Sequence, residues 1–254
     1  MEPQVRVHRL AEQVADHIRA QIIGGELADG DPLPKAEELN RRYPVSLPTL
    51  REAMRILEAE GLVTVRRGRL GGAVVHRPSP ANLGYNLGLV LAAQQAGIGD
   101  VAAALRHVEP ACAALCATRQ DRRRVVVPRL RELHEEYLAS IDDLPAAVAV
   151  SRRFHEALVS LCGNRPLIAL AGALEAVWSS HEEDWANRTE PHSVPLGKRK
   201  ASGEIHGRIL AHIEAGEPDA VHRLAAAHLA EAQRNPQPAG GDAIDLGRLR
   251  ELMY

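Results

Sequence analysis

Aromatic residues are scarce in this chain of 254 residues, which contains one Phe, two Trp and four Tyr. Hydrophobic residues still account for 45% of the sequence, so the apolar content consists mostly of Ala, Leu and Val. Because Ala and Leu are strong helix formers, this composition favours a mainly helical fold. The length is sufficient for one large domain or two modest ones, each with its own core.

Long apolar runs are also missing. No segment approaches the roughly 20 apolar residues that a helix needs to cross a bilayer, and the N-terminal region lacks the apolar core of a signal peptide. Cysteine is limited to Cys112, Cys116 and Cys162, an odd set without a CxxC pair, which we interpret as buried thiols in a reducing compartment. We therefore expect a cytoplasmic protein without a membrane partner.

Positive charge is concentrated in one short segment, although the net charge of the chain is −2. Residues 41–77 contain eight Arg against three Glu, a local net charge of +5, whereas residues 78–254 carry a net charge of −3. A basic patch confined to one segment is expected where that segment meets a polyanion.

The N-terminal third predicts three helices followed by a β-hairpin. Apolar spacing from Leu10 to Ile22 indicates a first helix that ends at Gly24, a short second helix is expected over residues 35–42, and a third helix begins after Ser46 and ends at Gly61. The segments LVTV and AVV, separated by the turn RRGRLGG, predict two paired strands. Three helices and a hairpin with a basic tip are typical of a winged helix-turn-helix.

The third helix has an apolar stripe and an opposite face that is available to DNA. Leu50, Met54 and Leu57 are expected to be buried. A single surface arginine is more often solvated than bound to DNA, but the complete set at this spacing favours DNA contacts. We expect the DNA-binding residues to be Lys35, Ser46, Leu47, Thr49, Arg51, Arg55, Arg66, Arg67 and Arg69.

The run LADGDPLPKAEELNRRYPVSLPTLREAMRILEAEGLVTVRRGRLGGAVV, within residues 10–76, resembles the DNA-binding domain of the GntR family of bacterial transcription regulators. Family members usually carry Ser-Glu-Arg where this chain has Lys35-Ala36-Glu37, and an Arg where it has Leu47. Both family arginines commonly touch DNA, so the resemblance implies DNA binding with an altered operator sequence. Arg51 and the glycine-rich turn are retained.

Beyond a proline-containing linker near residue 78, the sequence predicts helices as far as about residue 234, arranged as an antiparallel α-helical bundle. The expected domains are therefore a winged helix-turn-helix over residues 1–77, a helical effector-binding and dimerisation domain over 78–235, and a tail over 236–254. The fold class is mainly α.

Residues 83–233 resemble the ligand-binding domain of the FadR-type subgroup, called FCD. The motifs that carry this resemblance are LRHVEPACAALCATR, SRRFHEALVSLCGN and EIHGRILAHIEAGEPDAVHRLAAAHL. Many members bind a divalent metal through one Asp and three His. Carried over by position, the resemblance implies His155, His206 and His228 as metal ligands, with Ser151 at the place of the Asp.

Helical periodicity independently places each of these histidines on an apolar face, so each imidazole is expected to point to the core. A lone histidine on such a face is usually a core residue with a satisfied hydrogen bond. Three that converge in one bundle are rarely satisfied without a metal or a polar ligand.

The serine changes what this site is expected to bind. A hydroxyl is a neutral, poor metal ligand, so Ser151 is expected to contact a metal-bound water or the ligand, and Zn²⁺ or Ni²⁺ is the expected ion. The alternative is a metal-free pocket in which the histidines bind an anionic ligand directly. At Arg106 the resemblance implies a contact to a ligand carboxylate, and the alternative is an ion pair with Glu109, one turn away.

Two other protein classes are less compatible with the sequence. His155-Glu156 begins like the zinc-hydrolase motif HExxH, but Val159 occupies the place of the second histidine, which counts against a metal-dependent enzyme with a three-histidine site. A purely architectural DNA-binding protein would have no use for a buried histidine pocket. We expect a homodimeric, non-enzymatic transcription regulator, a repressor that a small organic acid releases from its double-stranded DNA operator.

Overall fold

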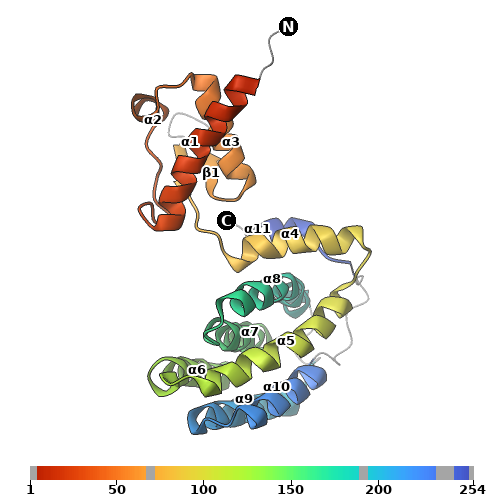
Figure 1. The fold of residues 1–254 in the computed structure, drawn as a ribbon. Coiled ribbons are helices and arrows are strands. Elements are labelled where there is room, and N and C mark those ends of the chain that lie inside the picture. Colours follow the sequence, from red (N-terminus) through yellow and green to blue (C-terminus); the bar gives the residue numbers. More distant parts are fainter. Residues whose placement is uncertain (1–4, 67–71, 189–193, 233–242, 252–254) are drawn as a thin grey trace. The chain divides into compact units, whose positions relative to one another are not determined.

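The computed structural model describes residues 5–66, 72–188, 194–232 and 243–251. The chain divides into two compact units, with the boundary between Ser79 and Pro80 (Figure 1). A mainly α fold with a winged helix-turn-helix and an antiparallel helical bundle is confirmed. None of the helices in the described ranges is long and apolar enough to cross a membrane.

The first unit contains three helices and a two-stranded antiparallel sheet. Its elements are α1 (Val5–Gly24), α2 (Ala36–Arg42), α3 (Leu47–Ala59), β1 (Val63–Arg66) and β2 (Gly72–Val75). The register pairs Val63 with Val75 and Arg66 with Gly72. The core lies between α1, α3 and the hairpin and is built from aliphatic side chains, among them Ile18, Ile22, Leu50, Leu57 and Val75.

Local chemistry defines both ends of α3. The Ser46 hydroxyl accepts a hydrogen bond from the backbone N–H of Thr49 at 3.3 Å, as an N-cap should, and Pro48 occupies the first turn. The helix stops before Gly61, whose φ of +71° is a left-handed conformation that favours glycine. Of the predicted stripe, Leu50 and Leu57 are buried, whereas Met54 is half-buried and packs at the edge of the core.

The second unit is a helical bundle. Its elements are α4 (Pro80–Ala93), α5 (Ile98–Thr118), α6 (Arg122–Ala139), α7 (Leu144–Ser160), α8 (Arg165–Arg188), α9 (Leu196–Ala215), α10 (Pro218–Ala232) and α11 (Leu246–Glu251). Helices α5, α10, α9, α6, α7 and α8 form a closed ring of packed neighbours, and α4 packs on α8 (Figure 1). Phe154, the one Phe of the chain, is fully buried in the core of this ring.

The described end of the chain packs on α4 rather than extending into solvent. Leu249 of α11 is fully buried, and a Cβ at Gly88 of α4 would lie only 2.5 Å from its Cδ1 atom. An isolated β-bridge also pairs Ala243 with Gly97, which precedes α5. The C-terminal segment 243–251 is therefore part of the helical unit.

Candidate functional site

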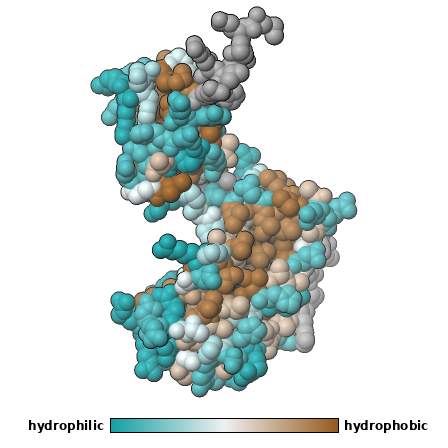
Figure 2. Space-filling model, viewed as in Figure 1, coloured by the Kyte–Doolittle hydropathy of each residue, from teal (hydrophilic) through white to brown (hydrophobic). Residues whose placement is uncertain are grey.

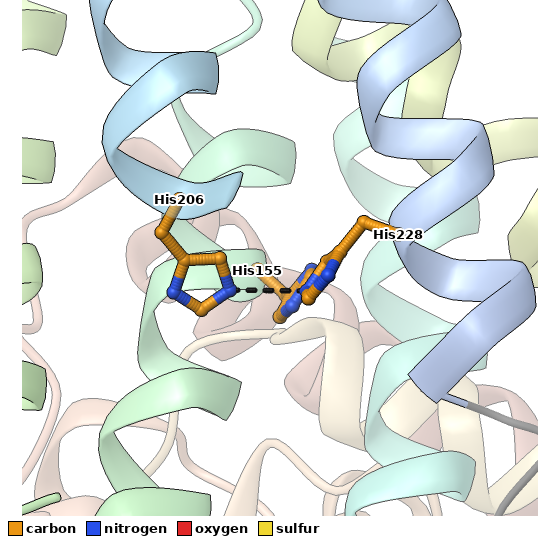
Figure 3. A group of neighbouring side chains, drawn as sticks. All are labelled: His155, His206 and His228. Atoms are coloured by element: carbon orange, nitrogen blue, oxygen red, sulfur yellow. Dashed lines mark hydrogen bonds between the residues drawn. The ribbon is translucent and has the colours of Figure 1, made fainter. Parts of the chain in front are cut away.

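Three histidines from different helices converge inside the helical unit (Figure 3). His155 lies on α7, His206 on α9 and His228 on α10, and their potential ligand nitrogens all lie within 4.8 Å of one another. The Nε2 atoms of His206 and His228 are 3.1 Å apart, within hydrogen-bonding distance. This is a constellation that three imidazole ligands of one metal ion require.

The positions of the rings follow from the apolar faces of their helices. His206 is completely buried on the face of α9 that also carries Ile209 and Ile213, and its ring stacks on Phe154 with a centroid distance of 4.3 Å. His228 is 3% exposed and shares the buried face of α10 with Ala225. The bundle core therefore fixes the imidazoles before any ligand binds.

Burial keeps two of these rings uncharged. It lowers the pKa of His206 well below its ordinary value and that of His228 to about 3, and the neighbouring His155 ring lowers both pKa values further. Near neutral pH both side chains are therefore neutral imidazoles, the form that binds metals. The buried Nδ1 of His206 has no hydrogen-bond partner among the described residues. The residues present therefore fit a divalent ion.

The third ring, that of His155, contacts Glu109, a carboxylate that the sequence suggested only as an alternative ion-pair partner of Arg106. Glu109 of α5 places Oε1 2.5 Å from Nδ1 of His155, although 46 residues separate the two side chains. Burial alone would raise the pKa of the Glu109 carboxyl, but the charge and hydrogen bond of His155, together with smaller effects of Glu175 and His228, outweigh burial and the pKa is lowered. The signal available in the sequence was a glutamate on the apolar face of α5, between Leu105 and Cys112.

A cavity of about 210 Å³ adjoins the cluster. Its lining includes His228, Ser151 and Tyr137, together with the cationic side chains of Lys198 and Arg199. Ser151 therefore lies at the edge of a space that reaches a histidine of the cluster, and its contact with a ligand or a metal-bound water stays a prediction. Arg106 is half-buried on α5 and is not among the described residues that line this cavity.

The candidate DNA-contacting residues fall into three groups. Lys35, Ser46, Leu47, Arg51 and Arg55 are exposed, as predicted, and Arg55 forms an ion pair with Glu52 at 2.9 Å. Arg66 ends β1, and nothing is described of its side chain, while Arg67 and Arg69 lie outside the described residues.

The expected orientation of Thr49 is wrong. Its side chain is only 3% exposed, and its Oγ1 lies 2.8 Å from Oγ of Ser46. The hydroxyl supports the N-terminal cap of α3 and faces the interior of the unit, so it does not present a donor to DNA.

A winged helix-turn-helix unit joined to a helical unit with a histidine-lined site defines a DNA-binding transcription regulator with an effector domain. Residues 10–74 match the family described as bacterial regulatory proteins, gntR family, and residues 100–231 match the FCD domain. The chain belongs to the GntR family, with an FCD domain as its C-terminal half.

Individual relatives span most of this chain. A putative L-lactate dehydrogenase operon regulatory protein of Escherichia coli (strain K12) is 28% identical over 229 residues, which cover 87% of this chain and 84% of the relative. The HTH-type transcriptional repressor NanR of Cronobacter sakazakii is 26% identical over 227 residues, with coverages of 87% and 83%. A solved Streptococcus agalactiae GntR structure aligns with a TM-score of 0.63 at 23% identity, covering 88% of this chain and 99% of that one. This last likeness shows the fold.

Proposed function

We propose that this chain is a homodimeric repressor that acts in the cytoplasm, and that a small organic acid releases it from its operator by binding at a divalent metal ion held by His155, His206 and His228. The observation that carries this proposal is the convergence of three histidines, with ligand nitrogens within 4.8 Å, beside a cavity of about 210 Å³. Relatives named as repressors support the direction of control.

The metal would be held by three neutral imidazoles, which favour ions such as Zn²⁺ or Ni²⁺ over ions that prefer oxygen ligands. When bound, it would supply a Lewis acid that accepts a carboxylate oxygen of the effector. Ser151 lines the same cavity as His228 and would hold a water or an effector oxygen by a hydrogen bond. Lys198, at the wall of the cavity, would add positive charge toward an organic anion.

The alternative in which the histidines bind an anion without a metal receives less support. Histidines that attract an anion by charge must be protonated, but burial lowers the pKa values of His206 and His228 and keeps both rings neutral near pH 7, which leaves Lys198 and Arg199 as the cationic groups of the cavity. The remaining ring, that of His155, already has a carboxylate partner in Glu109.

Arg51 and Arg55 on the exposed side of α3 would contact bases, and Lys35 would contact the DNA backbone near α2. Ser46 and Leu47 lie at the start of the same helix, and Leu47, 49% exposed, would meet a thymine methyl group. The wing arginines Arg66, Arg67 and Arg69 are proposed to reach phosphates. A single winged unit has a small interface, so two copies on a palindromic site are the expected arrangement.

An apolar area on the helical unit supports association of two copies. Leu83, Leu89 and Val90 of α4 are 41%, 41% and 54% exposed, and Figure 2 shows brown residues gathered over this part of the unit. A contiguous exposed apolar surface of this kind often marks an interface between proteins. An effector that shifts α7, α9 or α10 would repack the bundle and change the spacing of the two DNA-binding units.

The test combines metal analysis with DNA binding. Protein prepared without chelator or affinity tag should contain close to one Zn²⁺ or Ni²⁺ per chain, and His228→Ala should lose it. His222→Ala is the matched control, because His222 is exposed on the same helix. L-Lactate and related hydroxy acids are the first probes, since one relative is named for an L-lactate dehydrogenase operon.

The expected response is a rise in melting temperature with the effective acid and release of a labelled operator, both lost in His228→Ala and retained in His222→Ala. A wild-type protein that stays free of metal after incubation with Zn²⁺ and Ni²⁺ would contradict the metal site. Release of the operator by the acid in that metal-free protein would favour the anion pocket instead.

A further inference from the structure

Two carboxylates are buried in the described part of the chain, and both lie in the helical unit beside the histidine cluster. Glu109 is 1% exposed and Glu175, on α8, is 5% exposed. The two side chains are close enough to interact with each other. Carboxylates are rarely buried unless a positive charge or several hydrogen bonds compensate them. Their position therefore points to a positive charge in this part of the core.

The contact between Glu109 and His155 fixes one ring of the cluster. Oε1 of Glu109 lies 2.5 Å from Nδ1 of His155, so this nitrogen is engaged and a metal held by this ring would be bound through Nε2. The His155 ring lies parallel to that of His228, with an interplanar angle of 2° and a centroid distance of 5.2 Å. The carboxylate thereby selects both the tautomer and the direction of the ring.

The other carboxylate oxygen is also informative. Oε2 of Glu109 is buried and has no hydrogen-bond partner among the described residues. Within the described part of the chain, the groups that act on this carboxylate are therefore the His155 ring at Oε1 and the neighbouring Glu175 side chain. A cation on the far side of the His155 ring would compensate this charge through the polarisable imidazole.

The converging ligand groups themselves supply no negative charge, although Glu231 lines the adjoining cavity. His206 and His228 are neutral rings, and Ser151 carries a neutral hydroxyl at the edge of the cavity. A divalent ion held by imidazoles alone would retain its full charge in a buried environment, which is unfavourable.

We propose that Glu109 is the carboxylate of this metal site: a positioning residue that orients His155 through Nδ1 and offsets the charge of the ion without coordinating it. The proposal rests on the metal site proposed above. It assigns a role to a residue of α5, a helix that contributes none of the three histidines.

The decisive variant is Glu109→Gln, since the amide oxygen can still accept the Nδ1–H of His155 while the charge is removed. We expect metal retention against a chromogenic chelator at neutral pH to weaken by about 10-fold to 100-fold. The visible absorption of the Co²⁺-substituted protein should keep the intensity of the wild type, because the number of metal ligands is unchanged. Glu109→Asp retains the charge on a shorter side chain, so its metal retention should fall between those of the wild type and Glu109→Gln. It is the variant to measure if Glu109→Gln does not fold.

Two further variants test whether metal retention depends on the carboxylate at position 109 or on any negative charge near the site. Glu175→Gln removes the neighbouring buried carboxylate and should leave metal retention within about threefold of the wild type, a change far smaller than that expected from losing a carboxylate hydrogen-bonded to a ligand histidine. Adding Ser151→Asp to Glu109→Gln places a carboxylate one turn before His155 and should restore at least about tenfold of the lost affinity.

The outcomes distinguish this inference from the proposed function. Wild-type protein that takes up no Zn²⁺, Ni²⁺ or Co²⁺ would refute the metal site itself. Wild-type protein that binds metal with the same affinity as Glu109→Gln would refute only the role of Glu109, leaving its contact with His155 as an internal ion pair. An equal loss in Glu175→Gln and Glu109→Gln would also overturn the specific role of Glu109.

Discussion

Acid should destabilise the metal-free protein through its buried histidines. The folded state lowers the pKa of His228 from 6.5 to about 3, mainly because burial penalises the charged ring. The unfolded chain therefore binds a proton below pH 6.5 that the folded chain does not bind until about pH 3. Stability is greatest above pH 6.5 and falls as the pH drops from there toward 3.

The size of the effect follows from linkage. For a histidine with an unfolded pKa of about 6.5 that remains neutral in the folded state, the free energy of unfolding falls by about 2 kcal/mol between pH 7 and pH 5. The pKa of His206 is lowered in the same direction, so its titration adds to the loss. The pKa of Glu109 is lowered from 4.5, and its contribution is therefore lost only below this pH range.

Urea unfolding at pH 7 and pH 5, in the presence of a chelator, measures this difference. Tryptophan fluorescence is a suitable signal for the helical unit, because both tryptophans, Trp178 and Trp185, belong to α8. His228→Gln removes one titrating ring and should reduce the pH-dependent loss by about 2 kcal/mol, whereas His222→Gln should not. An identical loss in wild type and His228→Gln would show that the folded protein does not hold this ring neutral.

Three further predictions concern the other elements. Arg51→Ala should weaken binding to a specific operator by about 1–3 kcal/mol in a fluorescence anisotropy titration, and unchanged affinity would remove Arg51 from the DNA interface. Thr49→Val should leave operator affinity nearly unchanged but lower the melting temperature, because the hydroxyl contacts Ser46 rather than solvent; a loss of affinity at full stability would mean that Thr49 reaches DNA. Gly88→Ala should speed limited proteolysis of the C-terminal segment, since the new Cβ would lie 2.5 Å from Leu249; an unchanged cleavage rate would mean that the packing adapts.

The elements of the DNA-binding unit were predictable because their signals are local. Apolar spacing, the Ser46 cap and Gly61 lie within or next to the helices that they define, and α3 follows them. Thr49 was assigned to the wrong face because its sequence neighbourhood does not reveal that this position of the first turn of α3 faces the interior, while Leu47 is exposed.

For the candidate site, the sequence determined which face of each helix is buried, and this was enough to point His155, His206 and His228 inward. Helical periodicity carries that information because it depends only on neighbouring residues. The tertiary structure alone decided that the ligand nitrogens of the three rings lie within 4.8 Å of one another and that Glu109 contacts His155. These contacts join residues on different helices that are 22 or more positions apart in the sequence. They depend on how the helices rotate and stack around a shared core, which the sequence of a single helix does not determine.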